Sequence, residues 1–444
     1  MTTTRRTLFI ASGASLAAPN IAPAQEAPGV TANEIRIGST NSLSGPASAY
    51  SVISTCLTAM FRRLNEEGGI AGRRVNFTVY DDAYSPPRTL EQTRRLVEQD
   101  RVAFTFNQLG TPTNNAVHRY MNQRRVPHLF LATGADKWAN PREFPCTIGW
   151  QPSYRTEAQI YAKHVLETRP NARIALLHQN DDFGRDYLNG VRDVLGNRFD
   201  SMVRVATNEA TDPTVDSQIV QLQASGADVL ICGVIPRFAA QAIRRVHDIG
   251  WRPMMFMTNV SVSVGAVMEP AGKERGVGLI TSDYRKDQSD PAWANDPGMT
   301  EWRGFMQRFI PNGDLADNNF TYGYGVGTTM IQVLRQCGND FSRENIMRQA
   351  TNIAPMDVAT LLPGVKVQSQ PTNFNVIRQM QLQRWDGSGW VRFGNVIEGA
   401  NVDQRIGRRQ KSSGMITPAA TEPRKTQSSL AWASGAPNFS TKMQ

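Results

Sequence analysis

Short apolar stretches of strand type alternate along the chain with longer segments whose apolar residues recur at helical spacing. Ile35 and Ile37 alternate with polar residues, which predicts a strand with one buried face. From residue 52 to residue 64 apolar side chains recur every three or four positions, which predicts a helix. A strand that leads through a loop of small residues into a helix N-terminus can bind an anion, because free N–H groups and the helix dipole meet there. An ordinary βα turn has the same pattern.

The alternation continues through two regions of similar length. In the first region we expect further strands at residues 75–79, 102–106 and 126–131, with helices at 86–97 and 116–120. After Trp150 we expect helices at 154–168, 215–222 and 239–246, with strands at 173–177, 228–232, 253–257 and 276–282. Helical patterns follow at 302–310 and 324–334, and a last strand at 390–393. Strands alternating with helices predict parallel sheets covered on both faces, so the expected fold class is α/β with two lobes.

The N-terminus has the pattern of an export signal. Arg5 and Arg6 precede a short apolar stretch, and small residues at Ala22 and Ala24 suit signal-peptidase cleavage before Gln25. The pattern resembles a twin-arginine signal, and a general secretory signal is the alternative. We therefore expect residues 1–24 to be a signal peptide and the mature protein to be periplasmic.

The charge distribution bears on which partners to expect, and the cysteine positions bear on disulfides. Removing the two arginines of the signal lowers the formal net charge of the 444-residue chain from +9 to +7. Many of the remaining basic residues lie in 401–444, a tail rich in Ser, Thr and Pro that we expect to be disordered. With no recognisable nucleic-acid motif, we expect no nucleic-acid partner. Cys56 and Cys232 lie in apolar patterns typical of buried thiols; the pairing of any disulfide with Cys146 or Cys337 stays open.

The sequence contains no catalytic or metal-binding motif. Nucleophile elbow, P-loop and zinc-helix patterns are absent, and the five histidines are scattered. The acid pairs Asp81–Asp82 and Asp181–Asp182 each follow a strand, where turn and helix-capping roles are favoured. We therefore expect neither an enzyme nor a bound cofactor or metal.

Small hydroxyl residues and aromatic residues recur where the predicted strands end. Open α/β sheets bind ligands outside the carboxyl ends of their strands, so two facing lobes would form a cleft lined by these side chains. The strand-end candidates are Ser42, Ser44, Thr111, Thr113, Thr133, Trp150, Tyr154 and Phe183.

Three motifs carry a resemblance to a known family. They are Ile35-Arg-Ile-Gly followed by Ser44-Gly-Pro, Asn65-Glu-x-Gly-Gly-Ile-x-Gly-Arg73, and Tyr80-Asp-Asp82. Over about residues 34–395 the chain resembles the leucine/isoleucine/valine-binding proteins of bacterial ABC importers. The resemblance implies the type I periplasmic-binding fold, two doubly wound parallel-sheet lobes joined by a three-strand hinge. The implied lobes are residues 34–152 with 283–365, and residues 153–282 with 366–400.

The resemblance also implies binding roles. Leu109 to Thr113 and Ala132-Thr133 correspond to the family's ligand-carboxylate loops, while Tyr50 and Phe183 correspond to aromatic walls. Family members that bind amino acids hold the α-ammonium with an acid at the position of Thr258-Asn259, and this chain has no acid there until Glu269. The family's disulfide near Asp82 is not expected, because its cysteines are absent. The complete predicted site is Ser44, Tyr50, Leu109, Thr111, Thr113, Ala132, Thr133, Trp150, Tyr154, Phe183 and Asn259.

These expectations combine into one functional prediction. The chain is expected to be a monomeric, exported substrate-binding protein that delivers a small carboxylate-bearing molecule without an α-ammonium group to an ABC permease in the inner membrane. The alternatives are a periplasmic sensor of the same fold, and branched-chain amino-acid binding in which Asp283 or Asp182 supplies the missing acid. A sugar-responsive repressor of the same fold would need a helix-turn-helix where this chain has an export signal.

Overall fold

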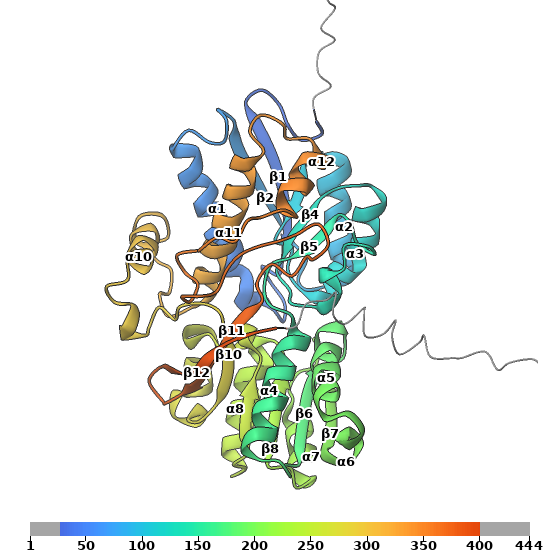
Figure 1. Cartoon of the computed structure of the whole chain (residues 1–444), viewed down its shortest axis with the longest axis vertical. Helices are drawn as coiled ribbons and strands as arrows, with labels where there is room; N and C mark the ends of the chain where they lie inside the picture. The colour runs from blue at the N-terminus through green and yellow to red at the C-terminus, as the bar shows by residue number, and fades with distance from the viewer. Residues whose placement is uncertain (1–26, 400–444) are drawn as a thin grey trace, which may run out of the picture. The chain divides into compact units, whose positions relative to one another are not determined.

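Two β-sheets with helices on both faces make up the part of the chain that the structure describes (Figure 1). The structure is a computed structural model, and it describes residues 27–399. The predicted signal peptide and the predicted basic tail lie outside the described residues.

All strands of the first sheet are parallel. Within residues 27–399 it has five strands in the order β2-β1-β3-β4-β5. They are β1 (Glu34–Asn41), β2 (Arg74–Asp81), β3 (Phe104–Phe106), β4 (His128–Leu131) and β5 (Thr147–Gly149). Ile35 and Ile37 are fully buried while Glu34 and Arg36 are partly exposed, so the alternating face predicted for β1 is confirmed.

The second sheet has seven strands in the described residues, in the order β12-β11-β10-β9-β8-β6-β7. They are β6 (Ile174–Gln179), β7 (Val203–Asn208), β8 (Val229–Gly233), β9 (Met254–Met257), β10 (Ile280–Asp283), β11 (Gln379–Trp385) and β12 (Trp390–Glu398). β11 and β12 pair antiparallel and the others parallel. The central strand β6 is buried along its whole length, as expected for a parallel strand covered on both faces.

The parallel parts of the two sheets have the same strand order. Counted along the chain, each runs second, first, third, fourth, fifth. This is a doubly wound order, in which ligands bind outside the carboxyl ends of the strands, where the order reverses. The predicted architecture of two doubly wound parallel sheets is therefore confirmed.

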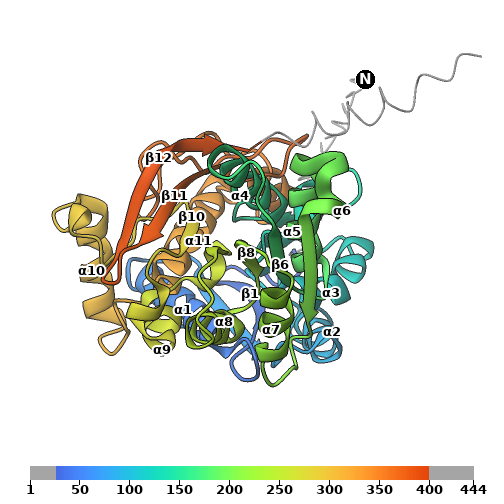
Figure 2. The ribbon, with the colours of Figure 1, turned by 90° about the horizontal axis from the view of Figure 1, so that it is seen from below.

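The helices form layers on both faces of each sheet. In the first sheet α1 packs against α11 on one face and α2 against α3 on the other (Figure 1). In the second, α4 packs against α5, and α7 against α8 on the opposite face (Figure 2). The helices are α1 (Ser51–Glu66), α2 (Pro86–Arg94), α3 (Thr111–Gln123), α4 (Tyr154–Thr168), α5 (Asp182–Leu195), α6 (Phe199–Met202), α7 (Asp216–Ala224), α8 (Pro236–Asp248), α9 (Glu269–Ala271), α10 (Pro297–Phe309), α11 (Asn319–Gln336) and α12 (Arg343–Ala350).

The chain leaves the second sheet after β10 and returns to it at β11. Between these strands lie α10, α11 and α12, of which α11 packs against α1 on the first sheet. α10 joins this layer through an apolar cluster that includes Trp302, Phe305 and Cys56. The segments between β5 and α4, after β10 and before β11 thus connect the two sheets.

The structure also contains helices and strands that the hydrophobic pattern did not predict, namely α5, α6, α9, α12, β5, β7 and β11. Among the described residues all four cysteines are free thiols, and Cys56 and Cys232 are buried as predicted.

Candidate ligand-binding site

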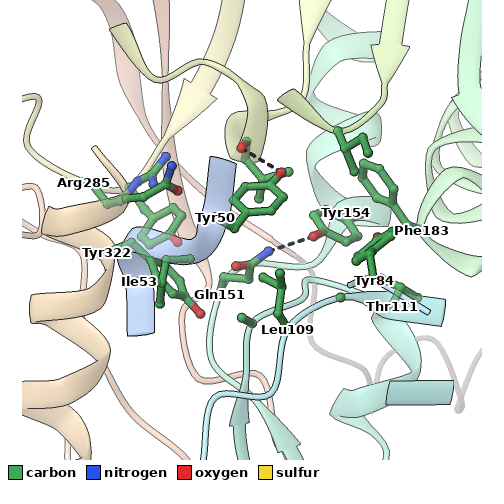
Figure 3. Close-up of a pocket in the computed structure, with 16 residues that line it drawn as sticks. Tyr50, Ile53, Tyr84, Leu109, Thr111, Gln151, Tyr154, Phe183, Arg285 and Tyr322 are labelled. Atoms are coloured by element: carbon green, nitrogen blue, oxygen red, sulfur yellow. Dashed lines mark hydrogen bonds between the residues drawn. The ribbon is translucent and has the colours of Figure 1, made fainter. Parts of the chain in front are cut away.

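A cavity lies between the carboxyl ends of the two sheets. It contains about 500 Å³ of space not filled by protein atoms, part of which is open to solvent. Figure 3 shows the side chains around it. Sixteen of the described residues line it: Tyr50, Ile53, Tyr84, Leu109, Gly110, Thr111, Ala132, Gln151, Tyr154, Phe183, Ile235, Val260, Tyr284, Arg285, Asn319 and Tyr322.

Helix N-termini surround the cavity. In the described part of the chain six helices begin at its wall, each marked by a lining residue at the N-cap or in the first turn. These residues are Tyr50 for α1, Gly110 for α3, Tyr154 for α4, Phe183 for α5, Ile235 for α8 and Asn319 for α11. The N-terminal end of a helix carries a partial positive charge, so the wall favours an anionic group in the cavity.

Aromatic side chains form much of the wall. The rings of Tyr154 and Phe183 lie 4.7 Å apart between centroids. The Tyr50 hydroxyl donates to the Val260 carbonyl at 3.0 Å, and the Tyr154 hydroxyl accepts from Gln151 at 2.9 Å. Burial raises the pKa of both tyrosines, so their hydroxyls stay neutral and serve as hydrogen-bonding groups.

The loop after β3 and the loop after β4 form one polar end of the cavity. Gly110 donates its N–H to the Ala132 carbonyl at 3.2 Å, and the hydroxyls of Thr111 and Thr133 are 2.6 Å apart. Gly110 has φ +94°, and a Cβ there would lie 2.5 Å from the ring of Tyr84. The close approach of the Tyr84 ring therefore requires glycine at this position.

Arg285 forms the other polar end. Its Nε and Nη2 donate to the two carboxylate oxygens of Asp283 at 2.8 and 2.9 Å, and Nη2 also donates to the Asn259 carbonyl at 2.9 Å. Both side chains of the pair are about 95% buried. Burial alone would lower the pKa of Arg285, but Asp283 raises it, so the guanidinium stays charged.

A buried carboxylate supports this end from behind. Glu157 on α4 is fully buried and accepts hydrogen bonds from Asn259 through the backbone N–H at 2.9 Å and the side-chain amide at 2.8 Å. Ser282 donates at 2.9 Å, and the hydroxyls of Tyr161 and Tyr187 donate as well. Burial raises the pKa of Glu157. The network holds Asn259, whose carbonyl accepts from Arg285.

Side chains from the first lobe contact α5 of the second lobe near the cavity. Asn115 on α3 donates to Asp182 at 2.8 Å, and Lys137 forms an ion pair with the same carboxylate at 3.3 Å. The Asp136 N–H donates to Asp186 at 2.7 Å. Together with the bond between Tyr50 and Val260, these contacts join the two lobes beside the cavity.

None of the sixteen lining residues is acidic. Six acids near them each accept hydrogen bonds from other protein groups: Asp82, Glu157, Asp181, Asp182, Asp283 and Asp317. Asp181 also caps the N-terminus of α5, as predicted for this acid pair. The described residues contain no cluster of three or more His, Cys, Asp or Glu placed to bind a metal. Within the same residues, no helix is both long and apolar enough to cross a membrane.

The structure brings part of the predicted site into the cavity wall. The predicted residues that line it are Tyr50, Leu109, Thr111, Ala132, Tyr154 and Phe183.

The other predicted residues lie beside or behind the wall. Ser44 is in an exposed loop and donates to Asp81 at 2.6 Å. Thr113 donates to the Leu109 carbonyl, and Thr133 contacts Thr111. The remaining two support lining residues: Trp150 packs against Tyr284 and Tyr322, and Asn259 contacts Arg285.

The sequence analysis missed several lining residues, and some had a usable signal. Tyr84 follows the second predicted strand, and Tyr284 and Arg285 follow the strand predicted at 276–282, so the strand-end rule applied to every strand would have included them. Asn319 and Tyr322 come from the start of α11, and no pattern in the sequence relates that helix to the cavity.

The sequence profile of the family described as "Periplasmic binding protein" matches residues 34–389. Curated relatives include the leucine-specific-binding protein of Salmonella typhimurium, 24% identical over 271 residues, which are 60% of this chain and 71% of the relative. The Leu/Ile/Val-binding protein of Escherichia coli is 22% identical over 265 residues, 58% of this chain and 70% of the relative.

Solved structures share the fold over most of the chain. A branched-chain amino acid ABC transporter protein from Thermus thermophilus with bound valine superimposes with a TM-score of 0.73 at 13% identity, covering 83% of this chain and 97% of its own. A fatty acid ABC transporter substrate-binding protein from Thermomonospora curvata has a TM-score of 0.70 at 18% identity, covering 84% and 95%.

Proposed function

The chain belongs to the periplasmic binding protein family, and we propose that it is the exported substrate-binding component of an ABC importer for a small organic acid without an α-ammonium group. One observation carries the proposal: six helix N-termini surround the cavity, and none of the described residues that line it carries a carboxylate. The wall therefore favours a negative group and offers no countercharge for a positive one.

The missing countercharge decides between organic acids and amino acids. An ammonium group buried without an acid partner costs several kcal/mol, which corresponds to more than a hundred-fold in affinity. Asp283 is occupied by Arg285, and Asp182 by Asn115 and Lys137, so neither is free to take an ammonium group. Relatives named for leucine and for fatty acids share a carboxylate in their ligands, and only leucine carries an ammonium group.

A matched pair of ligands tests the proposal. Leucine and 4-methyl-2-oxopentanoate have the same carbon skeleton and differ at the α-position, as do phenylalanine and phenylpyruvate. Thermal shift and calorimetry on the mature chain should show binding of the oxo acids and none of the amino acids. Stabilisation by leucine or phenylalanine without stabilisation by the matching oxo acid would refute the proposal.

The proposal includes the route of export and the partner. We infer that Arg5 and Arg6 belong to a twin-arginine signal, so that replacing both by lysine leaves the precursor in the cytoplasm. Export of the lysine variant at the normal rate would instead indicate the general secretory route. In the periplasm the loaded protein would deliver its ligand to a permease of the inner membrane and catalyse no reaction itself.

A further inference from the structure

Hydrogen-bond donors of Tyr284 and Arg285, at one end of the cavity, have no acceptor among the described residues. The Tyr284 hydroxyl is buried and has no hydrogen-bond partner among the described residues. Arg285 uses Nε and Nη2 for Asp283 and Asn259, and no described residue accepts from its Nη1. Both residues line the cavity, and the guanidinium carbon lies 5.2 Å from the centroid of the Tyr284 ring. The guanidinium group therefore packs against the ring that carries the unused hydroxyl.

This end is separate from the end where the threonine hydroxyls lie. Figure 3 shows Arg285 and Tyr322 on one side of the cavity and Thr111 and Phe183 on the other, with Tyr50, Gln151 and Leu109 between them. A ligand whose carboxylate lies at Thr111 thus presents its far end to Tyr284 and Arg285.

We propose that Tyr284 and Arg285 form a second ligand subsite that binds an uncharged oxygen, a hydroxyl or a carbonyl, at the far end of the organic acid. The inference rests on the proposed function, because it takes the ligand carboxylate to lie at the Thr111 end. A buried hydroxyl without a partner is unfavourable, and a ligand oxygen would give it and Nη1 a shared acceptor.

The charges around this end of the cavity favour an uncharged ligand oxygen over a second carboxylate. Asp283 already neutralises Arg285 through two hydrogen bonds. Asp317 is a further buried acid near Tyr50, and its carboxylate accepts from Ser263 and Asn319. A second ligand carboxylate would add a negative group to a buried end that holds two acids and one guanidinium. A hydroxyl or carbonyl oxygen accepts the same hydrogen bonds without that repulsion.

A series of straight-chain acids tests the subsite. Each acid from butanoate to octanoate is compared with its ω-hydroxy acid and with the dicarboxylate of the same length, by calorimetry on the mature chain. At the length that spans the cavity, the ω-hydroxy acid should bind about ten-fold tighter than the plain acid. The dicarboxylate should bind more weakly than the ω-hydroxy acid.

The Tyr284→Phe variant isolates the hydroxyl. Because that hydroxyl makes no hydrogen bond within the described residues, the variant should keep the melting temperature of the ligand-free protein. It should lose the advantage of the ω-hydroxy acid over the plain acid. Tyr120→Phe is the matched control, since its hydroxyl donates to Glu98 on the surface; it should keep that advantage. Arg285→Lys, which keeps the charge opposite Asp283, should also reduce the advantage.

Each outcome bears on a separate claim. Equal binding of plain and ω-hydroxy acids, or an advantage that survives in Tyr284→Phe, would overturn the subsite. Strongest binding by a dicarboxylate would overturn its assignment to an uncharged oxygen. Failure of the proposed function appears in the comparison of amino acids with oxo acids, which involves no change at Tyr284. If the oxo acids bind and no acid of this series does, the subsite is overturned and the proposed function stands.

Discussion

Replacing Glu157 should separate the value of its hydrogen bonds from that of its charge. The side chain is fully buried and accepts from Tyr161, Tyr187, Ser282 and twice from Asn259. Methionine has a similar length and accepts none of these bonds, whereas glutamine keeps one carbonyl oxygen. The two variants therefore remove different numbers of acceptors from the same place.

The loss of stability depends on how many of these donors can form a hydrogen bond with another acceptor. Tyr161 also donates to the Met257 carbonyl at 2.8 Å, so it keeps a partner in either variant. Among the described residues, the Tyr187 hydroxyl and the two N–H donors of Asn259 donate to Glu157 alone. Three buried donors without acceptors, at about 1–3 kcal/mol each, predict a loss of about 3–9 kcal/mol for Glu157→Met. The free energy of unfolding of a typical protein is about 5–15 kcal/mol, so this variant should be close to unfolding.

Glu157→Gln should destabilise the protein much less than Glu157→Met. The Oδ1 atom of Asn259 is buried without a partner, and turning the Asn259 amide would present this oxygen to the new side-chain amide. The remaining loss is that of charge-assisted bonds, about 1–3 kcal/mol. Urea unfolding followed by tryptophan fluorescence measures both, with Glu167→Met on the exposed side of α4 as a control that should stay within about 0.5 kcal/mol. A loss below about 1 kcal/mol for Glu157→Met would show that the network does not support the fold.

Two further predictions concern the cavity and the contact between the lobes. Thr111→Ala should weaken binding of an organic acid about ten- to a hundred-fold. Thr133→Ala should weaken it only about two- to ten-fold, because Thr133 acts through the Thr111 hydroxyl. Calorimetry that gives the reverse order would place the ligand carboxylate at Thr133. Burial alone would raise the pKa of Asp182, but Arg185 and Asn115 lower it, so its contribution to stability is present above about pH 4 and lost as the pH falls through the lowered pKa. Asp182→Asn should remove that part of the pH dependence at a cost of about 0.2–1 kcal/mol at neutral pH, measured as melting temperature against pH; an unchanged profile would contradict it.

The fold could be predicted because strand and helix patterns alternate regularly, but α5 shows where local patterns fail. Glycines disfavour a helix interior, and α5 contains Gly184 and Gly190. A Cβ at Gly190 would lie 2.4 Å from the Arg155 carbonyl on α4. Glycine is needed there by the packing of two helices, and such a requirement is invisible in the sequence alone.

The candidate site could be located from the sequence but not completed. Strand ends identify the region of the cavity, and Thr111 and Phe183 were found in this way. The same rule gave Trp150, which packs behind the wall and donates to Thr329 at 3.0 Å. Which side of a loop faces the cavity depends on packing from elements distant in the chain. The sequence therefore does not show that Arg285 lines the cavity or that Asp283 forms an ion pair with it.

The enclosure of the cavity has a kinetic consequence. Separation of the contacts of Asn115 and Asp136 with α5 would widen the exit for a ligand held between the two sheets. Opening also breaks the contacts that the ligand makes with both lobes, so differences in affinity among well-fitting ligands should appear mainly in their dissociation rates. A permease that pulls α3 away from α5 would shorten the residence time of the ligand without touching any residue that binds it.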